Sequence, residues 1–339
     1  MKKQIAHSIL ELAIVSKDST FKQTLNNSLT LAKVAEANNY KRYWFAEHHN
    51  SDAVGSSATS ILIGYVAENT NKIRVGSGGI MLPNHSPLII AEQFGTLAHL
   101  YPNRIDLGLG RAPGTDTVTA QAIRSDFMKA AQSFPAEIEK IEHYFSLANK
   151  SSKVRAAIAE GVNVPIYILG SSTDSAHLAA KKGLPYAFAS HFASTHLLNA
   201  LNIYQQEFRP SESLESPYTI AGVNVVVADT DEEAQRLFTS LIRMFFGVLT
   251  GNSQPLQPPT DMTDDLKDIF QHPSLYQMLK YSFVGNKETV KEQTKAFLKE
   301  TQVDELIVVS TIYDIKDRIK SAELFAGVMK DINEAEDSN

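Results

Sequence analysis

The feature that most constrains the fold of this chain is a regular alternation of short apolar runs with longer helical patterns. Eight runs have the length and composition of buried strands, and each is followed by apolar residues at helical spacing. The predicted strands lie within Ile5–Val15, Arg42–Ala46, Lys72–Gly76, Arg104–Leu109, Pro165–Leu169, Leu184–Ala189, Thr219–Ala228 and Glu305–Val309. Because strands that alternate with helices pair in parallel, the sequence predicts an α/β protein.

The number of units favours one parallel arrangement over another. Eight strand–helix units in 339 residues suit a closed (β/α)8 TIM barrel, with an open doubly wound sheet as the alternative. We expect one barrel domain over residues 1–339. One segment, Thr250–Phe283, breaks the pattern after the seventh helix, with four prolines before Tyr276 and few β-branched residues. It is predicted to be an insertion near the active-site end, either a lid or a disordered surface loop.

The composition argues against several kinds of function. The chain has no cysteine, which excludes disulfides, thiolate catalysis and cysteine metal sites. A net charge of −6 without a basic run argues against nucleic-acid binding. No apolar stretch approaches the roughly 18 residues of a membrane span. Polar residues interrupt the N-terminal MKKQIAHSILELAIV, so we expect a first strand rather than a signal peptide, and a cytoplasmic protein.

Polar, charged and glycine-rich segments follow four of the predicted strands. In a barrel, ligands bind at the carboxyl ends of the strands, so these segments are candidates for one site. The candidates are Glu47, His48 and His49 after the second strand, Gly78, Gly79 and His85 after the third, Arg111 after the fourth, and Gly170, Ser171, Ser172 and Ser175 after the fifth.

The turn after the fifth strand is a candidate anion site. Its serines would lie beside the free N–H groups and the positive dipole end of the next helix, and the permanently charged Arg111 could reach the same anion. The alternative is that Asp174 or Ser175 only caps the helix.

The paired histidines and paired glycines each leave alternatives open. Adjacent histidines in an extended segment point apart, and no HExxH spacing occurs, so a metal site is not expected. A histidine with a pKa near neutrality suits acid–base catalysis, whereas a buried structural pair is the other interpretation. Gly78-Gly79 permits either a flat ring packed against backbone or a simple turn.

The Glu47-His48-His49 motif and the later LP-x-HSP-x-x-x-AEQ pattern, in this order and spacing, resemble the luciferase-like flavin-dependent oxidoreductases. The resemblance extends to YILGSSTDSAHLAAKKGLP and to the C-terminal FVGNKETVKEQ. It implies a (β/α)8 barrel that binds FMN at the strand carboxyl ends. It also implies a homodimeric monooxygenase that uses reduced FMN (FMNH2) from a separate flavin reductase, together with O2, to oxidise a small organic substrate.

The resemblance also implies roles for particular residues. His48 matches a catalytic histidine beside the flavin, with Glu47 orienting it and His49 adjacent, and His85 matches a histidine near the flavin. Gly78-Gly79 matches a non-proline cis peptide under the flavin ring. The phosphate-binding positions match Arg111, Ser171, Ser172 and Ser175, in the turn that Gly170 opens.

The chain also departs from the bacterial luciferases. These enzymes carry a reactive cysteine and a glutamate in the phosphate turn, whereas this chain has no cysteine and has Ser171 at the glutamate position, so light emission is not expected. The closer resemblance is to uncharacterised bacterial members. The alternative functions are a non-catalytic flavin-binding protein on the same fold, a deazaflavin-dependent oxidoreductase and, more remotely, a metal-dependent barrel hydrolase.

Overall fold

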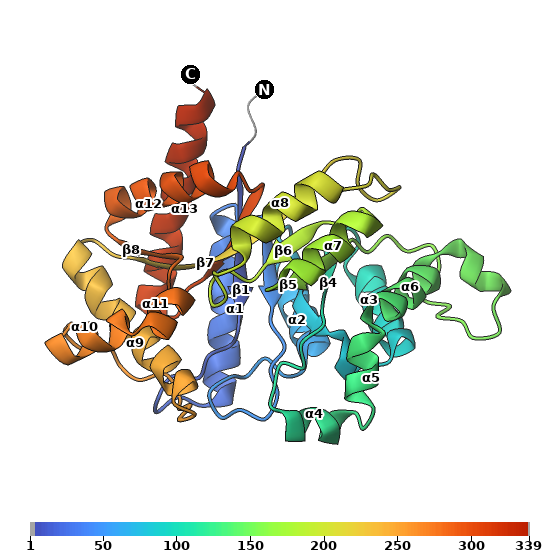
Figure 1. The fold of residues 1–339 in the computed structure, drawn as a ribbon, viewed down its shortest axis with the longest axis horizontal. Helices are drawn as coiled ribbons and strands as arrows, with labels where there is room; N and C mark the ends of the chain where they lie inside the picture. Colours follow the sequence, from blue (N-terminus) through green and yellow to red (C-terminus); the bar gives the residue numbers. More distant parts are fainter. Residues whose placement is uncertain (1–3, 338–339) are drawn as a thin grey trace.

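The computed structural model describes residues 4–337 and contains a closed barrel of parallel strands (Figure 1). The strands are β1 (Ala6–Glu11), β2 (Arg42–Phe45), β3 (Arg74–Met81), β4 (Ile105–Gly110), β5 (Ile166–Gly170), β6 (Tyr186–Phe188), β7 (Thr219–Val227), β8 (Ser282–Gly285) and β9 (Glu305–Val309). From β1 to β7 each strand pairs with the next, β7 then pairs with β9, and β9 pairs with β1. The eight predicted strands and the barrel are confirmed, and closure rules out the open sheet.

Helices connect the strands and cover the outside of the barrel (Figure 1). They are α1 (Phe21–Ala37), α2 (Thr59–Glu68), α3 (Pro87–Leu100), α4 (Thr117–Ile123), α5 (Phe127–Gln132), α6 (Phe134–Phe145), α7 (Thr173–Lys182), α8 (Leu197–Glu207), α9 (Asp231–Leu249), α10 (Asp264–Gln271), α11 (Pro273–Met278), α12 (Lys287–Thr301) and α13 (Ile315–Asp337), with 3-10 turns η1 (Leu82–Asn84) and η2 (Leu147–Ser151). The sequence did not predict α4 and α5, because helices of 7 and 6 residues are too short to show a periodic pattern. None of the helices within residues 4–337 has the length and hydropathy to cross a membrane.

Strand residues are buried on both faces of the barrel wall. Tyr43 and Phe45 belong to the large apolar cluster between strands and helices, whereas Trp44 belongs to a separate cluster with Leu10 and Ile307 inside the barrel. This division follows from the alternation of side chains along a strand. It explains why the strands form nearly continuous apolar runs in the sequence.

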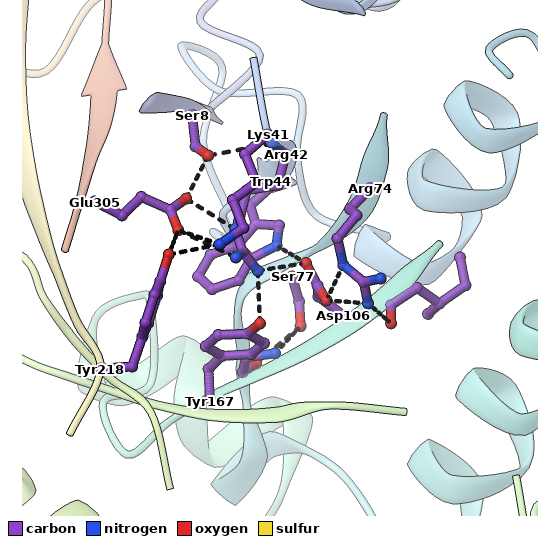
Figure 2. A network of polar contacts seen from close by, with 12 residues as sticks. Ser8, Lys41, Arg42, Trp44, Arg74, Ser77, Asp106, Tyr167, Tyr218 and Glu305 are labelled. Carbon is purple, nitrogen blue, oxygen red and sulfur yellow. Dashed lines mark hydrogen bonds and ion pairs between the residues drawn. The ribbon is translucent and has the colours of Figure 1, made fainter. Parts of the chain in front are cut away.

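A buried polar network fills the barrel at the amino ends of the strands (Figure 2). Arg42 donates hydrogen bonds to Glu305 (Nε to Oε1, 2.8 Å), to Asp106 (Nη1 to Oδ2, 2.8 Å) and to the hydroxyl of Tyr167 (2.7 Å). The indole of Trp44 donates a further bond to Asp106. Arg42, Asp106 and Glu305 are almost completely buried, and they come from β2, β4 and β9. The network fills this end of the barrel, which leaves the opposite end as the candidate position for a ligand site.

The segment of the predicted insertion, residues 250–283, contains two helices. It contains α10 and α11 and leads into β8, which the sequence did not predict because β8 is a short strand in a segment with few β-branched residues. Together with α9, the segment forms an apolar cluster that includes Phe238, Leu275 and Leu279. Figure 1 shows α9, α10 and α11 on the left of the barrel and α5 and α6 on the right.

Candidate active site

A cavity of about 1010 Å³ lies at the carboxyl ends of the barrel strands. Helices α5, α9 and α11 contribute to its walls through residues such as Met128, Phe245 and Met278. Most predicted site residues line it: His48, His49 and Gly78 from the second and third strands, and Arg111, Gly170, Ser171, Ser172 and Ser175 from the fourth and fifth. Ligand sites for drug-sized molecules span about 300–1,000 Å³, so this cavity has the size of a large binding site.

Glu47 lies behind the cavity wall and is only 1% exposed. The imidazoles of His49 and His85 each donate from Nε2 to Glu47 Oε1 at 2.9 Å. The Asn84 side chain and the backbone N–H of Met81 donate as well, at 3.2 Å each. Burial by itself would raise the pKa of Glu47, but the hydrogen bonds from His49 and His85 outweigh burial and hold that pKa at about 2.

These contacts bear on the predicted roles of Glu47, His85 and Gly79. The Glu47 carboxylate binds His49 and His85, so any effect of Glu47 on the position of His48 acts through these neighbours. Neither Glu47 nor His85 lines the cavity, and neither does Gly79. Glu47 is therefore a positioning residue that connects the segment after β2 with the segment after β3 through hydrogen bonds. Asn84 also donates to the carbonyl oxygen of Pro113 (2.9 Å), which connects a third segment.

We expect Glu47→Gln to lower the free energy of unfolding at pH 7 by roughly 3 kcal/mol, the equivalent of a pKa depressed from 4.5 to about 2. Because the folded pKa is the lower one, this contribution is present above pH 4.5 and is lost as the pH falls toward 2. The deficit of the variant should therefore shrink over that range, as measured by urea unfolding at several pH values. The exposed Glu323→Gln is the control, and a deficit of Glu47→Gln that does not change with pH would contradict the assignment.

His48 and His191 bring two imidazoles to the cavity from the segments after β2 and β6. Burial lowers the pKa of His48, although the nearby charge of Glu47 opposes the change. Burial, together with the nearby His48, lowers the pKa of His191 to about 3. The Nδ1 atoms of both rings are buried without a hydrogen-bond partner among the described residues. Both imidazoles are therefore neutral at pH 7.

The floor of the cavity includes bare backbone at Gly78. A Cβ atom there would lie 2.7 Å from Leu10 Cδ1 and 3.1 Å from Trp44 Cβ, so no side chain fits. The Gly78–Gly79 peptide bond is cis, as the resemblance implied. Backbone packed flat on the inner apolar layer of the barrel offers a surface on which a planar ring can lie.

Charged groups gather on the side of the cavity formed by β4 and β5. Arg111 Nη2 lies 3.3 Å from Asp174 Oδ2, and these side chains are 52% and 68% exposed. Such an exposed pair adds little stability, which leaves Arg111 free to bind an anion. Ser172 is the N-cap residue of α7 but makes no side-chain capping bond. Ser175 donates to the Ser172 carbonyl (2.7 Å) and does not accept from a backbone N–H there, so the helix N-terminus stays accessible to a ligand.

The match to known proteins decides the family. A family model described as luciferase-like monooxygenase matches residues 8–324. The chain belongs to the luciferase-like monooxygenase family. The chain is 43% identical to a luciferase-like monooxygenase of Escherichia coli over 330 residues, covering 97% of this chain and 98% of that protein.

Solved structures agree with this assignment. The crystal structure of apo-MsnO8 is similar with a TM-score of 0.88 and 32% identity, covering 96% of this chain and 99% of that one. The oxygenating constituent of 3,6-diketocamphane monooxygenase from Pseudomonas putida, solved in complex with FMN, has a TM-score of 0.71 at 16% identity, covering 95% and 97%. The second likeness concerns the fold alone.

Three sets of residues at the site of this luciferase-like monooxygenase were not predicted from the sequence. His191 follows the sixth strand, and the rule that ligands bind after barrel strands could have found it. Asn84 lies inside the quoted LP-x-HSP pattern, but its bond to Glu47 depends on the fold. The wall residues of α9 and α11, such as Phe245 and Met278, carried no sequence signal because apolar residues in helices are usually core residues.

Proposed function

We propose that this luciferase-like monooxygenase is FMN-dependent and uses O2 to oxidise a small organic substrate, with FMNH2 supplied by a separate reductase. The observation that carries the proposal is the composition of a single cavity. It joins an exposed arginine beside a helix N-terminus, bare backbone at Gly78 and a neutral histidine. The likeness to a barrel solved with FMN supports the proposal by analogy of fold.

The residues of the cavity fit FMN at both of its ends. Arg111 and the first turn of α7, with Ser171, Ser172 and Ser175, would hold the phosphate. The backbone at Gly78 would support the flavin ring. The bound flavin supplies the redox chemistry with O2, while the protein supplies position and electrostatics.

The remaining roles fall to the side chains of the chain itself. The apolar walls exclude water from the reacting molecules. The neutral imidazole of His48 can accept a proton or donate a hydrogen bond at the site of reaction. Glu47 fixes the loop that carries His48 by holding His49 and His85.

The phosphate side of the cavity can be tested with two ligands that differ only in the phosphate. We expect FMN to bind about 10- to 100-fold more tightly than riboflavin, because a hydrogen bond to a charged group contributes about 1.5–3 kcal/mol. Arg111→Ala should remove most of this preference while riboflavin binding stays unchanged, as measured by flavin fluorescence quenching. The matched control is Arg155→Ala, since Arg155 pairs with Glu160 and does not line the cavity. Equal affinities for FMN and riboflavin in the unaltered protein would contradict the assigned phosphate site.

The reaction can be tested by supplying FMNH2 and 18O2 with a panel of small organic compounds. Incorporation of one 18O atom into a product, detected by mass spectrometry, is the expected result. Oxidation supported by reduced coenzyme F420 but not by FMNH2 would replace the proposal with a deazaflavin-dependent enzyme. Tight FMN binding without oxygenation of any compound would favour a flavin-binding protein.

A further inference from the structure

The ionisable residues of the cavity are unevenly distributed. Among the described residues that line it, the ionisable ones are His48, His49, Arg111, Asp174 and His191. Arg111 and Asp174 pair with each other on the side of β4 and β5. The wall formed by α9 and α11 consists instead of Met244, Phe245, Val248 and Met278. One side of the cavity is thus charged and the other side is apolar.

Two of the three cavity histidines are neutral at pH 7. Burial lowers the pKa of His191 to about 3, and burial also lowers the pKa of His48. The third, His49, hydrogen-bonds Glu47 behind the cavity wall (2.9 Å). A charged ligand group against the wall of α9 and α11 would lose its hydration without gaining a partner of opposite charge from that wall, which is strongly unfavourable.

The cavity is large for a single small ligand. Pockets that hold one drug-sized ligand span roughly 300–1,000 Å³, and this cavity of about 1010 Å³ reaches the upper limit of that range. If the phosphate of a flavin lies beside Arg111, the apolar side remains for a second, smaller molecule. The methionines in its wall are flexible and adapt to ligands of different shapes.

We propose that the apolar side of the cavity, walled by Met244, Phe245, Val248 and Met278, binds the organic substrate, and that this substrate is an uncharged, mainly apolar molecule. The inference rests on the proposed function, because that function places the flavin phosphate beside Arg111 and makes the second molecule a substrate. The binding preference itself can be measured on protein without flavin.

The preference can be tested with three molecules of the same chain length and different charge: 1-octanol, octanoate and octylamine. Each would compete with the neutral dye Nile red for the protein, with dye fluorescence as the readout. Saturating inorganic phosphate keeps octanoate away from Arg111. We expect 1-octanol to bind at least tenfold more tightly than either charged molecule. Equal affinity of octanoate or octylamine would overturn the proposal.

A charge placed in the wall should change the preference. Met278 is half-buried, so Met278→Lys leaves its ammonium group close to water and should fold normally. This variant should bind octanoate at least tenfold more tightly than the unaltered protein and 1-octanol more weakly. Ser274→Lys adds the same charge to an exposed position on the same helix outside the cavity and should change neither affinity. Identical behaviour of the two variants would show that the ligands bind elsewhere.

Repeating the competition with saturating FMN separates this inference from the proposed function. If 1-octanol binds selectively but FMN does not bind at all, the apolar site stands and the flavin assignment fails. If FMN binds but the charged molecules compete as well as 1-octanol, the flavin assignment stands and the substrate class fails.

Discussion

Arg42→Met should lower the free energy of unfolding by about 3–5 kcal/mol, the cost of removing one partner from a buried ion pair. Arg42 is 1% exposed and is the cation shared by two buried carboxylates, Asp106 and Glu305. Methionine fills much of the same volume but leaves both carboxylates without this partner. Arg74 still contacts Asp106 from the barrel edge, and Lys41 lies 3.8 Å from Glu305, so the loss is expected to be large but not complete (Figure 2).

Urea unfolding followed by far-ultraviolet circular dichroism measures this loss. The matched control is Arg236→Met, because Arg236 forms an exposed pair with Glu233, with side chains 37% and 41% exposed. The control should change stability by at most about 1 kcal/mol. Equal losses in the two variants would show that the barrel does not depend on the buried network.

His48→Ala should lower kcat/KM by about 10²–10⁴-fold on any substrate identified with 18O2, the usual contribution of a positioned acid or base. FMN affinity should stay within a few-fold, because the proposed phosphate contacts are Arg111 and the first turn of α7 and do not include His48. Thermal stability should also be retained, since the imidazole has a buried Nδ1 atom without a partner. Unchanged turnover would remove His48 from the mechanism.

The pH dependence separates proton transfer from simple ordering of the pocket. Burial lowers the pKa of His48, so the neutral base should persist below pH 6.5, and activity should fall at a lower pH than an ordinary histidine would give. His48→Gln keeps a hydrogen-bonding group of similar reach but cannot transfer a proton in this range. If His48→Gln loses most of the activity, and its pH–activity profile no longer falls at acidic pH, His48 transfers a proton. If the variant keeps near-normal activity and an unchanged pH–activity profile, His48 only orders the pocket. As a control, the half-exposed His177→Ala should leave the profile unchanged.

Local patterns determined the fold because they depend only on residues near one another in the chain. Tyr43, Trp44 and Phe45 form an apolar run, and such a run predicts a strand buried on both sides wherever it lies. The repetition of strand and helix then indicated the barrel. The short strand β8 and the short helices α4 and α5 were not predicted, because an element of so few residues does not show a clear periodic pattern.

The sequence by itself determined the eight barrel strands, the motifs that identify the family and the segments that meet at the carboxyl ends. Only the tertiary structure decided which side chains form partners there. Glu47 accepts a hydrogen bond from His85, which is 38 residues away, and not from the imidazole of its neighbour His48. The bare floor at Gly78, the neutral His191 and the apolar wall of Met278 likewise depend on packing between distant segments. The spacing of residues along the chain determines the face of a strand or helix on which each side chain lies. Which side chains of different strands come into contact depends on how the barrel closes.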